Sequence, residues 1–282
     1  MDTIRRHWKF AICAPVAFAF IAITDVRAAT LNINSNPPLP VRNLLHNPSI
    51  EEGTDSNPAH WRWGTAVPEN FKVAWSTEAR TGHRSLYIKA FSGVMSGYWT
   101  QVVRVEPKVH YTFCGWFRLK SGKILVYVHG RVGNRRLDER FYAQSARSLF
   151  LVLIFLKPEY VRGMHPERWY PFRIDFTTFE GMEFIAASVG MYFTAGEVWF
   201  DDLELRRATV TLKIAVNAPE GIKRVIVLMR DRDKALFDSG DLAGAREFKR
   251  VISNAPSDAH YTLRVITVDG KVHERMYPTG NS

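Results

Sequence analysis

Apolar and polar residues alternate with a period of two along most of the chain, which is the pattern of β-strands with one buried face. Between 111 and 118, for example, Tyr111, Phe113 and Phe117 fall on one face of the predicted strand. Clusters of glycine, proline and asparagine separate such runs, and no long stretch has helical spacing. The pattern predicts strands over 71–76, 84–91, 98–105, 110–119, 123–132, 148–156, 169–178, 183–193 and 196–206. Many short strands with turns between them indicate an all-β sandwich or barrel.

A second set of strands follows a break near Ala208. It is predicted over 209–217, 222–230, 245–252, 260–268 and 271–277, with a hairpin turn at Asp269-Gly270. We therefore expect a large β-sandwich over 43–208 and a smaller, immunoglobulin-like β-sandwich over 209–282. Residues 29–42 are polar and rich in proline, and we expect them to form an extended lead-in.

The N-terminus has the order of a secretory signal peptide. Basic residues lead into the apolar stretch from Phe10 to Thr24, and Val26-Arg27-Ala28 supplies a cleavage site. This predicts a signal peptide over 1–28 and a secreted, periplasmic or cell-envelope protein with no membrane span after cleavage. An uncleaved anchor is the alternative, although the stretch is short beside the ~20 residues of a membrane span. Cleavage would leave Cys114 as the sole cysteine, so the mature chain would depend on its core and not on a disulfide.

The chain carries 38 lysines and arginines against 28 acids, a formal net charge of +10. In an exported protein this favours an acidic polysaccharide partner and argues against nucleic acid. The alternative is that the charge only aids solubility.

Four segments occur in an order typical of one class of secreted module. They are Asn47-Pro48-Ser49-Ile50-Glu51-Glu52-Gly53 followed by Pro58 and Trp61, then Thr81–Ile88, then Trp99–Val105 leading into Tyr111–Arg118, and finally Gly196–Leu205. Over about 43–207 the chain resembles the galactose-binding-like jelly-roll modules, which are carbohydrate-binding modules that bind cellulose, xylan and related glycans in secreted glycoside hydrolases. The resemblance implies a jelly-roll fold, but a fold alone does not identify the ligand.

The resemblance also implies a structural Ca²⁺ where the first and last strands meet. The implied ligands are the side chain of Glu51, the backbone carbonyl of Ser85 and the carboxylate of Asp202, with Asp201 or Glu52 as substitutes. Calcium takes six to eight oxygen ligands, so a cluster of acids with backbone carbonyls is suitable chemistry. The alternative is that these acids cap turns and face water.

Modules of this class bind sugars on the concave face of one sheet or in loops at the end of the sandwich. Strand alternation places six polar or aromatic residues off the core, namely Trp116, Arg118, Tyr127, His129, Arg131 and Tyr192. Aromatic rings beside hydrogen-bond donors suit sugars, and arginine suits a carboxylated sugar. Trp61 and Trp63, after Pro58, are a second candidate platform. Two alternatives remain open: the insertion 133–168 covers the face, or the loop tryptophans plug the sandwich.

No catalytic motif accompanies these residues. The sequence contains no nucleophile elbow, phosphate-binding loop, zinc spacing or dinucleotide fingerprint. We therefore expect a non-catalytic carbohydrate-binding protein. The alternatives are a polysaccharide lyase or hydrolase with its site on the same face, and a structural or adhesive envelope protein that binds a protein partner.

Overall fold

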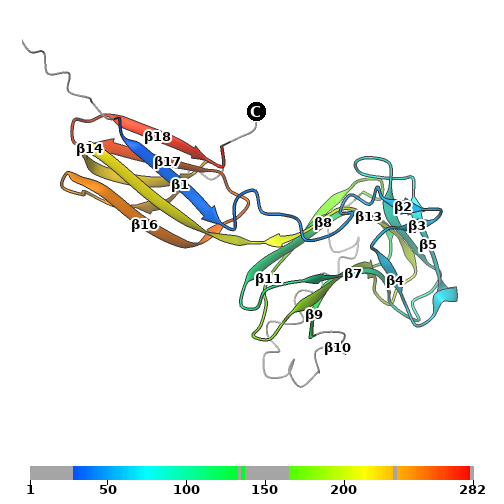
Figure 1. Cartoon of the computed structure of the whole chain (residues 1–282). Helices are drawn as coiled ribbons and strands as arrows, with labels where there is room; N and C mark the ends of the chain where they lie inside the picture. Colours follow the sequence, from blue (N-terminus) through cyan, green and yellow to red (C-terminus); the bar gives the residue numbers. More distant parts are fainter. Residues whose placement is uncertain (1–27, 133–134, 137–164, 231–233, 280–282) are drawn as a thin grey trace, which may run out of the picture.

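The computed structural model describes residues 28–132, 135–136, 165–230 and 234–279, and within these ranges nearly all regular structure is β (Figure 1). The helical element in the described residues is one 3₁₀ turn, η1 (Pro68–Asn70). The predicted signal peptide, up to residue 27, and the predicted strand 148–156 lie outside the described residues. Within the described part, no helix has the length and apolar character needed to cross a bilayer.

The first unit is a jelly-roll sandwich of two antiparallel five-stranded sheets, which confirms the predicted all-β fold. We name each sheet after its central strand. The β12 sheet has the order β10 (Arg135–Arg136), β9 (Ile124–Val132), β12 (Phe184–Met191), β7 (Gly97–Arg104) and β4 (Arg62–Gly64). The β13 sheet has the order β11 (Tyr170–Thr177), β8 (His110–Ser121), β13 (Gly196–Arg207), β6 (Ser85–Ala90) and β5 (Phe71–Ser76). A small hairpin, β2 (Gly53–Thr54) with β3 (Asn57–Pro58), precedes them.

The core lies between the two sheets. Phe113 and Phe117 reach it from the β13 sheet, and Val126 and Val189 reach it from the β12 sheet, all fully buried. These are the residues that period-two alternation places inward. Burial of each such side chain contributes about 1.5–3 kcal/mol, so the core accounts for the stability of a unit without disulfides.

The second unit has six strands and a hydrophobic core of its own. Its strands are β1 (Thr30–Asn36), β14 (Thr209–Met229), β15 (Lys234–Asp238), β16 (Ala245–Pro256), β17 (Tyr261–Thr267) and β18 (Val272–Tyr277). The first half of β14 lies between β1 and β16, and its second half lies between β15 and β17. The hydroxyl of Tyr261 donates to the carbonyl of Pro256, a contact that also marks one corner of immunoglobulin-like sandwiches. The immunoglobulin-like class itself stays a prediction.

Strand β1 corrects the expected organisation of the chain. The sequence pattern predicts an extended lead-in over 29–42, but residues 30–36 form an edge strand that pairs antiparallel with 211–217. Leu31 and Ile33 are buried in alternation with exposed residues. Only these two apolar side chains mark the period among threonine, asparagine and serine residues, so the strand pattern is faint. The jelly roll is therefore inserted between β1 and β14, and the second unit does not simply follow the first.

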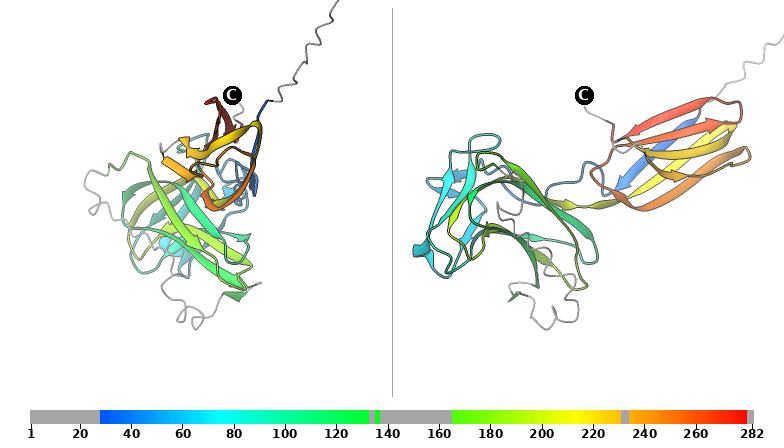
Figure 2. Two further views of the ribbon diagram at one scale, coloured as in Figure 1. Left: turned by 90° about the vertical axis from the view of Figure 1, so that its left-hand side faces the viewer. Right: turned by 180° about the vertical axis from the view of Figure 1, so that it is seen from behind.

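Polar contacts join the two units at the chain crossing near Ala208. Arg206 donates to the hydroxyl of Ser257 at 2.7 Å, and Arg173 forms an ion pair with Asp258 at 3.0 Å. The amide of Ser257 donates to the carbonyl of Ala208 at 2.9 Å. The units lie end to end in Figure 1 and in the right-hand view of Figure 2.

Candidate functional site

The structure does not bring the six predicted ligand-binding residues of the strands onto one face. Strands β8 and β9 follow each other in the chain, but β8 belongs to the β13 sheet and β9 to the β12 sheet. Trp116 and Arg118 therefore face outward on one side of the sandwich, and Tyr127 and His129 face outward on the other. This corrects the prediction of a single shared face.

Trp116 and Arg118 belong to a closed cluster on the outer face of the β13 sheet. The guanidinium of Arg80 lies 3.8 Å from the ring centre of Trp116, and that of Arg118 lies 4.2 Å from the ring centre of Trp199. Tyr87 packs against Trp199 at 5.0 Å. Each of these two tryptophans thus has a guanidinium over its ring, where a sugar would otherwise stack. Cation–π contacts of this kind contribute about 0.5–2 kcal/mol each, and they explain the cluster as support for the sheet.

The two loop tryptophans pack inward. Trp61 is 4% exposed, and its indole nitrogen donates to the carbonyl of Asn47 at 3.2 Å. Trp63 is half-buried on β4 and packs edge-on against Phe71 and Trp99 at 5.3 and 5.6 Å. Both residues therefore close the sandwich, and the prediction of a sugar platform at Trp61 and Trp63 is corrected.

The outer face of the β12 sheet carries the remaining candidates and three residues that we did not predict as part of a site, namely Tyr98, Thr100 and Ser188. Tyr98 on β7 and Tyr127 on β9 meet edge to face with ring centres 5.3 Å apart. His129 stacks beside Tyr127 at 5.6 Å. Ser188 on β12 pairs in register with both Tyr127 and Thr100, and the two hydroxyl oxygens of Ser188 and Thr100 are 2.8 Å apart. Aromatic rings and hydroxyl groups thus lie side by side on three neighbouring strands.

The central strand β12 explains why the rings stand where they do. On this face it presents Ala186, Ser188 and Gly190, which are small and buried. The neighbouring strands β7 and β9 carry the large side chains. The outer surface of the sheet is therefore recessed along β12 and raised along β7 and β9. Tyr98 lies directly over the glycine, since a Cβ added at Gly190 would lie 2.6 Å from the Tyr98 Cβ.

Arginine is the charged residue type of the described strands of this sheet. As far as the structure describes them, its strands contain five arginines and no aspartate or glutamate; the arginines are Arg62, Arg104, Arg131, Arg135 and Arg136. Arg62 and Arg104 are exposed. Arg131 is opposite Phe184 in the β9–β12 register, and its side chain lies outside the described part. A ligand on this face therefore meets cations and hydrogen-bond donors.

Tyr192, the last predicted residue, lies just after β12 at the end of the same sheet. It contacts Phe193 edge-on at 4.9 Å, and the Lys123 amine lies 5.7 Å from its ring centre. The question of whether 133–168 covers the β12 face falls mostly on residues outside the described part. The sequence did contain the signal for Tyr98 and Thr100, because Trp99, Gln101 and Val103 alternate with them and are buried.

The residues implied as calcium ligands surround the loop 80–85. Glu51 Oε1 accepts hydrogen bonds from the amides of His83 and Arg84 at 2.9 and 3.0 Å. The Asp202 carboxylate accepts from the Arg80 guanidinium and the Thr81 hydroxyl, both at 2.6 Å. Within the described residues, no three acidic, histidine or cysteine side chains converge on a point that would hold a metal.

Ser85, the third implied ligand, is buried, and its hydroxyl donates to the carbonyl of Glu78 at 2.5 Å. An ion at this loop would have to displace Arg80 from Asp202. Calcium binding by Glu51, Ser85 and Asp202 therefore stays a prediction.

Asp201 is the most perturbed acid near this loop. Burial raises its pKa to about 6, although the amides of Arg80, Thr81 and Asp202 all donate to its carboxylate. It belongs to β13 and its partners are backbone groups. The hydrogen bonds to Asp201 hold the loop 80–85 against the β13 sheet. Asp201 is therefore not part of the β12 face.

Comparisons with known proteins give similar folds and no family. No family model matches the chain, and no curated protein matches its sequence. One similar structure is the module TmCBM61 in complex with β-1,4-galactotriose, 22% identical, covering 59% of this chain and 99% of that one, with a TM-score of 0.38. A CBM22-1 xylan-binding domain from Paenibacillus barcinonensis is 15% identical over 59% of this chain and 95% of its own, with a TM-score of 0.35.

A third similar structure is the enzymatically active domain of tailspike protein 4 from bacteriophage CBA120. It is 9% identical over 58% of this chain, with a TM-score of 0.43, and the match spans only 21% of the tailspike's length.

Proposed function

We propose that this protein binds a polysaccharide on the outer face of the β12 sheet and is exported to do so. The observation that carries the proposal is the juxtaposition of Tyr98 and Tyr127 with the hydroxyl of Thr100, which pairs with the buried Ser188 hydroxyl on the strand between them. Sugar rings present C–H groups to aromatic side chains and hydroxyls to polar ones, so a surface with both kinds of group at this spacing suits them. The residues that can contact a ligand are Tyr98, Thr100, Tyr127 and His129, and the buried Ser188 positions the Thr100 hydroxyl.

The ligand that this face suits best is a polysaccharide with acidic groups. Arg62 pairs in register with Thr100, in the same row as Ser188 and Tyr127, and Arg104 lies further along β7. Arginine offers a planar fork of donors that matches a carboxylate or sulfate. The absence of acids in the described strands of the sheet means that nothing there repels such a group.

We infer binding without hydrolysis, and the composition of the described strands supports this inference. Glycoside hydrolases use a pair of carboxyl groups on either side of the scissile bond. The described strands of the β12 sheet supply none, and the buried Asp201 lies in the other sheet.

Binding of the whole chain to an array of neutral and acidic polysaccharides tests this proposal. We expect Tyr98→Ala/Tyr127→Ala to weaken binding by tenfold or more, because each lost contact of about 1.4 kcal/mol corresponds to a factor of ten. Trp116→Ala, on the opposite sheet, is the matched control and should bind like the native protein. Absence of binding to every glycan by a folded sample would refute the proposal.

The same incubations separate binding from catalysis. An increase in chain ends or in unsaturated sugar products would favour a lyase or hydrolase instead. Export is tested by sequencing the N-terminus of the protein recovered outside the cytoplasm, where we expect Ala29 as the first residue.

A further inference from the structure

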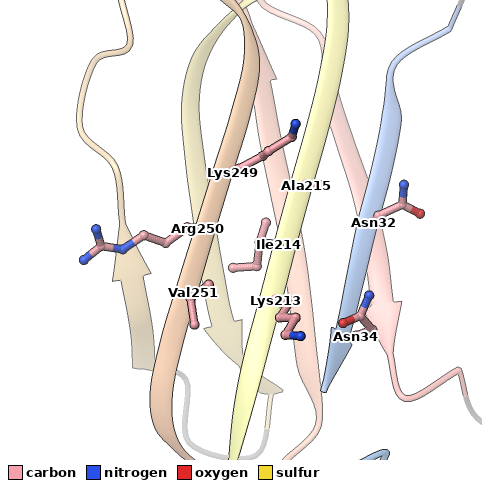
Figure 3. A pocket seen from close by; sticks show the side chains of 8 residues that line it. All are labelled: Asn32, Asn34, Lys213, Ile214, Ala215, Lys249, Arg250 and Val251. Atoms are coloured by element: carbon pink, nitrogen blue, oxygen red, sulfur yellow. The ribbon is translucent and has the colours of Figure 1, made fainter. Parts of the chain in front are cut away.

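The second unit has a shallow groove on its outer surface, far in sequence from the proposed sugar face. It has a volume of about 440 Å³ and lies over three adjacent strands, β1, the first half of β14, and β16 (Figure 3). The middle strand β14 contributes Ala215, whose short side chain leaves space between its neighbours. Asn32 on β1 and Lys249 on β16 are opposite Ala215 in the two registers and form the sides of the groove.

The next row of the sheet continues the groove. Lys213 is opposite Asn34 on β1 and opposite Val251 on β16. Lys213 and Lys249 are therefore diagonal neighbours on adjacent strands, with backbones about 7–8 Å apart. Figure 3 shows both amines on the same side of the sheet as the two asparagine amides, whereas Ile214 points the other way. Arg250 leaves the groove and lies over the ring of Phe237 at 5.3 Å.

The two lysines of this groove have no ion-pair partner among the residues that the structure describes. Lys213 and Lys249 are exposed, and within the described residues neither makes an ion pair or a side-chain hydrogen bond. The Oδ1 atom of Asn32 accepts from Arg275 at 3.2 Å, which leaves its amide group as a donor. Glu247 lies on the same side of β16, two residues before Lys249. It is opposite Asn217, one row beyond the groove. The lining therefore offers donors and cations to a ligand.

We propose that this groove is a second polysaccharide site, which binds a run of acidic sugar units. Two lysines at this separation can contact acidic groups on one or two successive units, and the amides of Asn32 and Asn34 can donate to oxygens between them. Val251, which is 58% exposed, supplies an apolar surface for the C–H face of a sugar. No aromatic residue lines the groove, so it lacks the stacking platforms on which single-stranded nucleic acids depend.

The site does not rest on the proposed β12 face, and its test keeps the two apart. The probe is a short carboxylated oligosaccharide, tetragalacturonate, titrated calorimetrically into the whole chain at low and high salt. We expect Lys213→Gln/Lys249→Gln to weaken groove binding at least tenfold, and we expect the affinity of the native protein to fall as salt rises. Both lysines are exposed, so this variant should keep the native melting temperature.

The matched control is Lys223→Gln/Lys234→Gln, which makes the same change in net charge at exposed lysines elsewhere in the second unit. It should retain groove binding within about twofold, since distant surface charges are screened. Groove binding should also survive in Tyr98→Ala/Tyr127→Ala, even if the β12 face binds nothing. Equal losses in the two lysine variants would show a net-charge effect and overturn the proposal, as would unchanged binding in Lys213→Gln/Lys249→Gln.

Discussion

Gly190 offers the sharpest test of the packing on the β12 face. A side chain at this position is excluded by neighbouring atoms, whereas the backbone conformation of Gly190 would permit one. A Cβ at this position would lie 2.1 Å from the carbonyl oxygen of Gly97 and 2.6 Å from the Cβ of Tyr98. Ordinary contacts of a Cβ begin at 3.4 Å. The obstructing atoms are backbone or are fixed to it, so they cannot rotate away. Gly190→Ala must push β7 away from β12 by roughly 1 Å, and overpacking of this kind costs about 1–3 kcal/mol.

The control is Gly64→Ala, which adds the same methyl group beside the same tyrosine. Its Cβ would lie 3.5 Å from the Tyr98 ring, an ordinary contact. A glycine in a strand costs about 0.5–1 kcal/mol relative to alanine, so this control should be as stable as the native protein or slightly more stable.

Urea unfolding followed by tryptophan fluorescence suits the comparison of Gly190→Ala with this control. Apart from Trp8, every tryptophan lies in the jelly roll, so the signal reports mainly on that unit. We expect Gly190→Ala to lose about 2–3 kcal/mol of unfolding free energy, close to the upper end for overpacking. Equal unfolding midpoints for Gly190→Ala and the native protein would refute the packing described for Tyr98.

Three further predictions concern the junction, the free thiol and calcium. Burial alone raises the pKa of Asp258, but the hydrogen bond from Arg173 and the charge of Arg206 outweigh it and hold that pKa below its usual value. Asp258→Ala should therefore lower the melting temperature at neutral pH, and the difference from the native protein should vanish as the pH falls below about 4. Burial raises the pKa of Cys114 to about 12, so the thiol should react with a disulfide reagent at pH 8 only after unfolding; rapid reaction of the native protein would contradict this. If calcium binds at Asp202, millimolar Ca²⁺ should raise the melting temperature over chelator and Asp202→Asn should abolish the rise; equal melting temperatures in calcium and chelator would count against the site.

The inward faces of the strands could be predicted from the sequence because alternation directly reports burial. Phe113, Phe117 and Val189 fill the core, as expected. The sheet to which each strand belongs could not be predicted in this way. Trp116 and Tyr127 both point outward, but alternation cannot show that they do so on opposite sides of the sandwich.

Two other features depend on contacts that a local pattern does not contain. Strand β1 pairs with residues that follow it by about 180 positions in the sequence, and only two apolar side chains mark its buried face. Trp61 is large and amphipathic, and the same residue type suits a sugar platform or a core. Its hydrogen bond to the Asn47 carbonyl decides for the core, and that contact depends on how the loop folds back.

The insertion of the jelly roll between β1 and β14 has a mechanical consequence. The first and last strands belong to the same unit and are tied by a hydrogen bond of 2.7 Å between Ser35 Oγ and the Tyr277 hydroxyl. Tension applied to the two ends of the chain would load the ladder between β1 and β14 in shear, while the inserted unit lies outside the load path. The face with Tyr98 and Tyr127 would keep its conformation under a pulling force until β1 detaches. Its affinity for a ligand would therefore not change with tension along the chain up to that point.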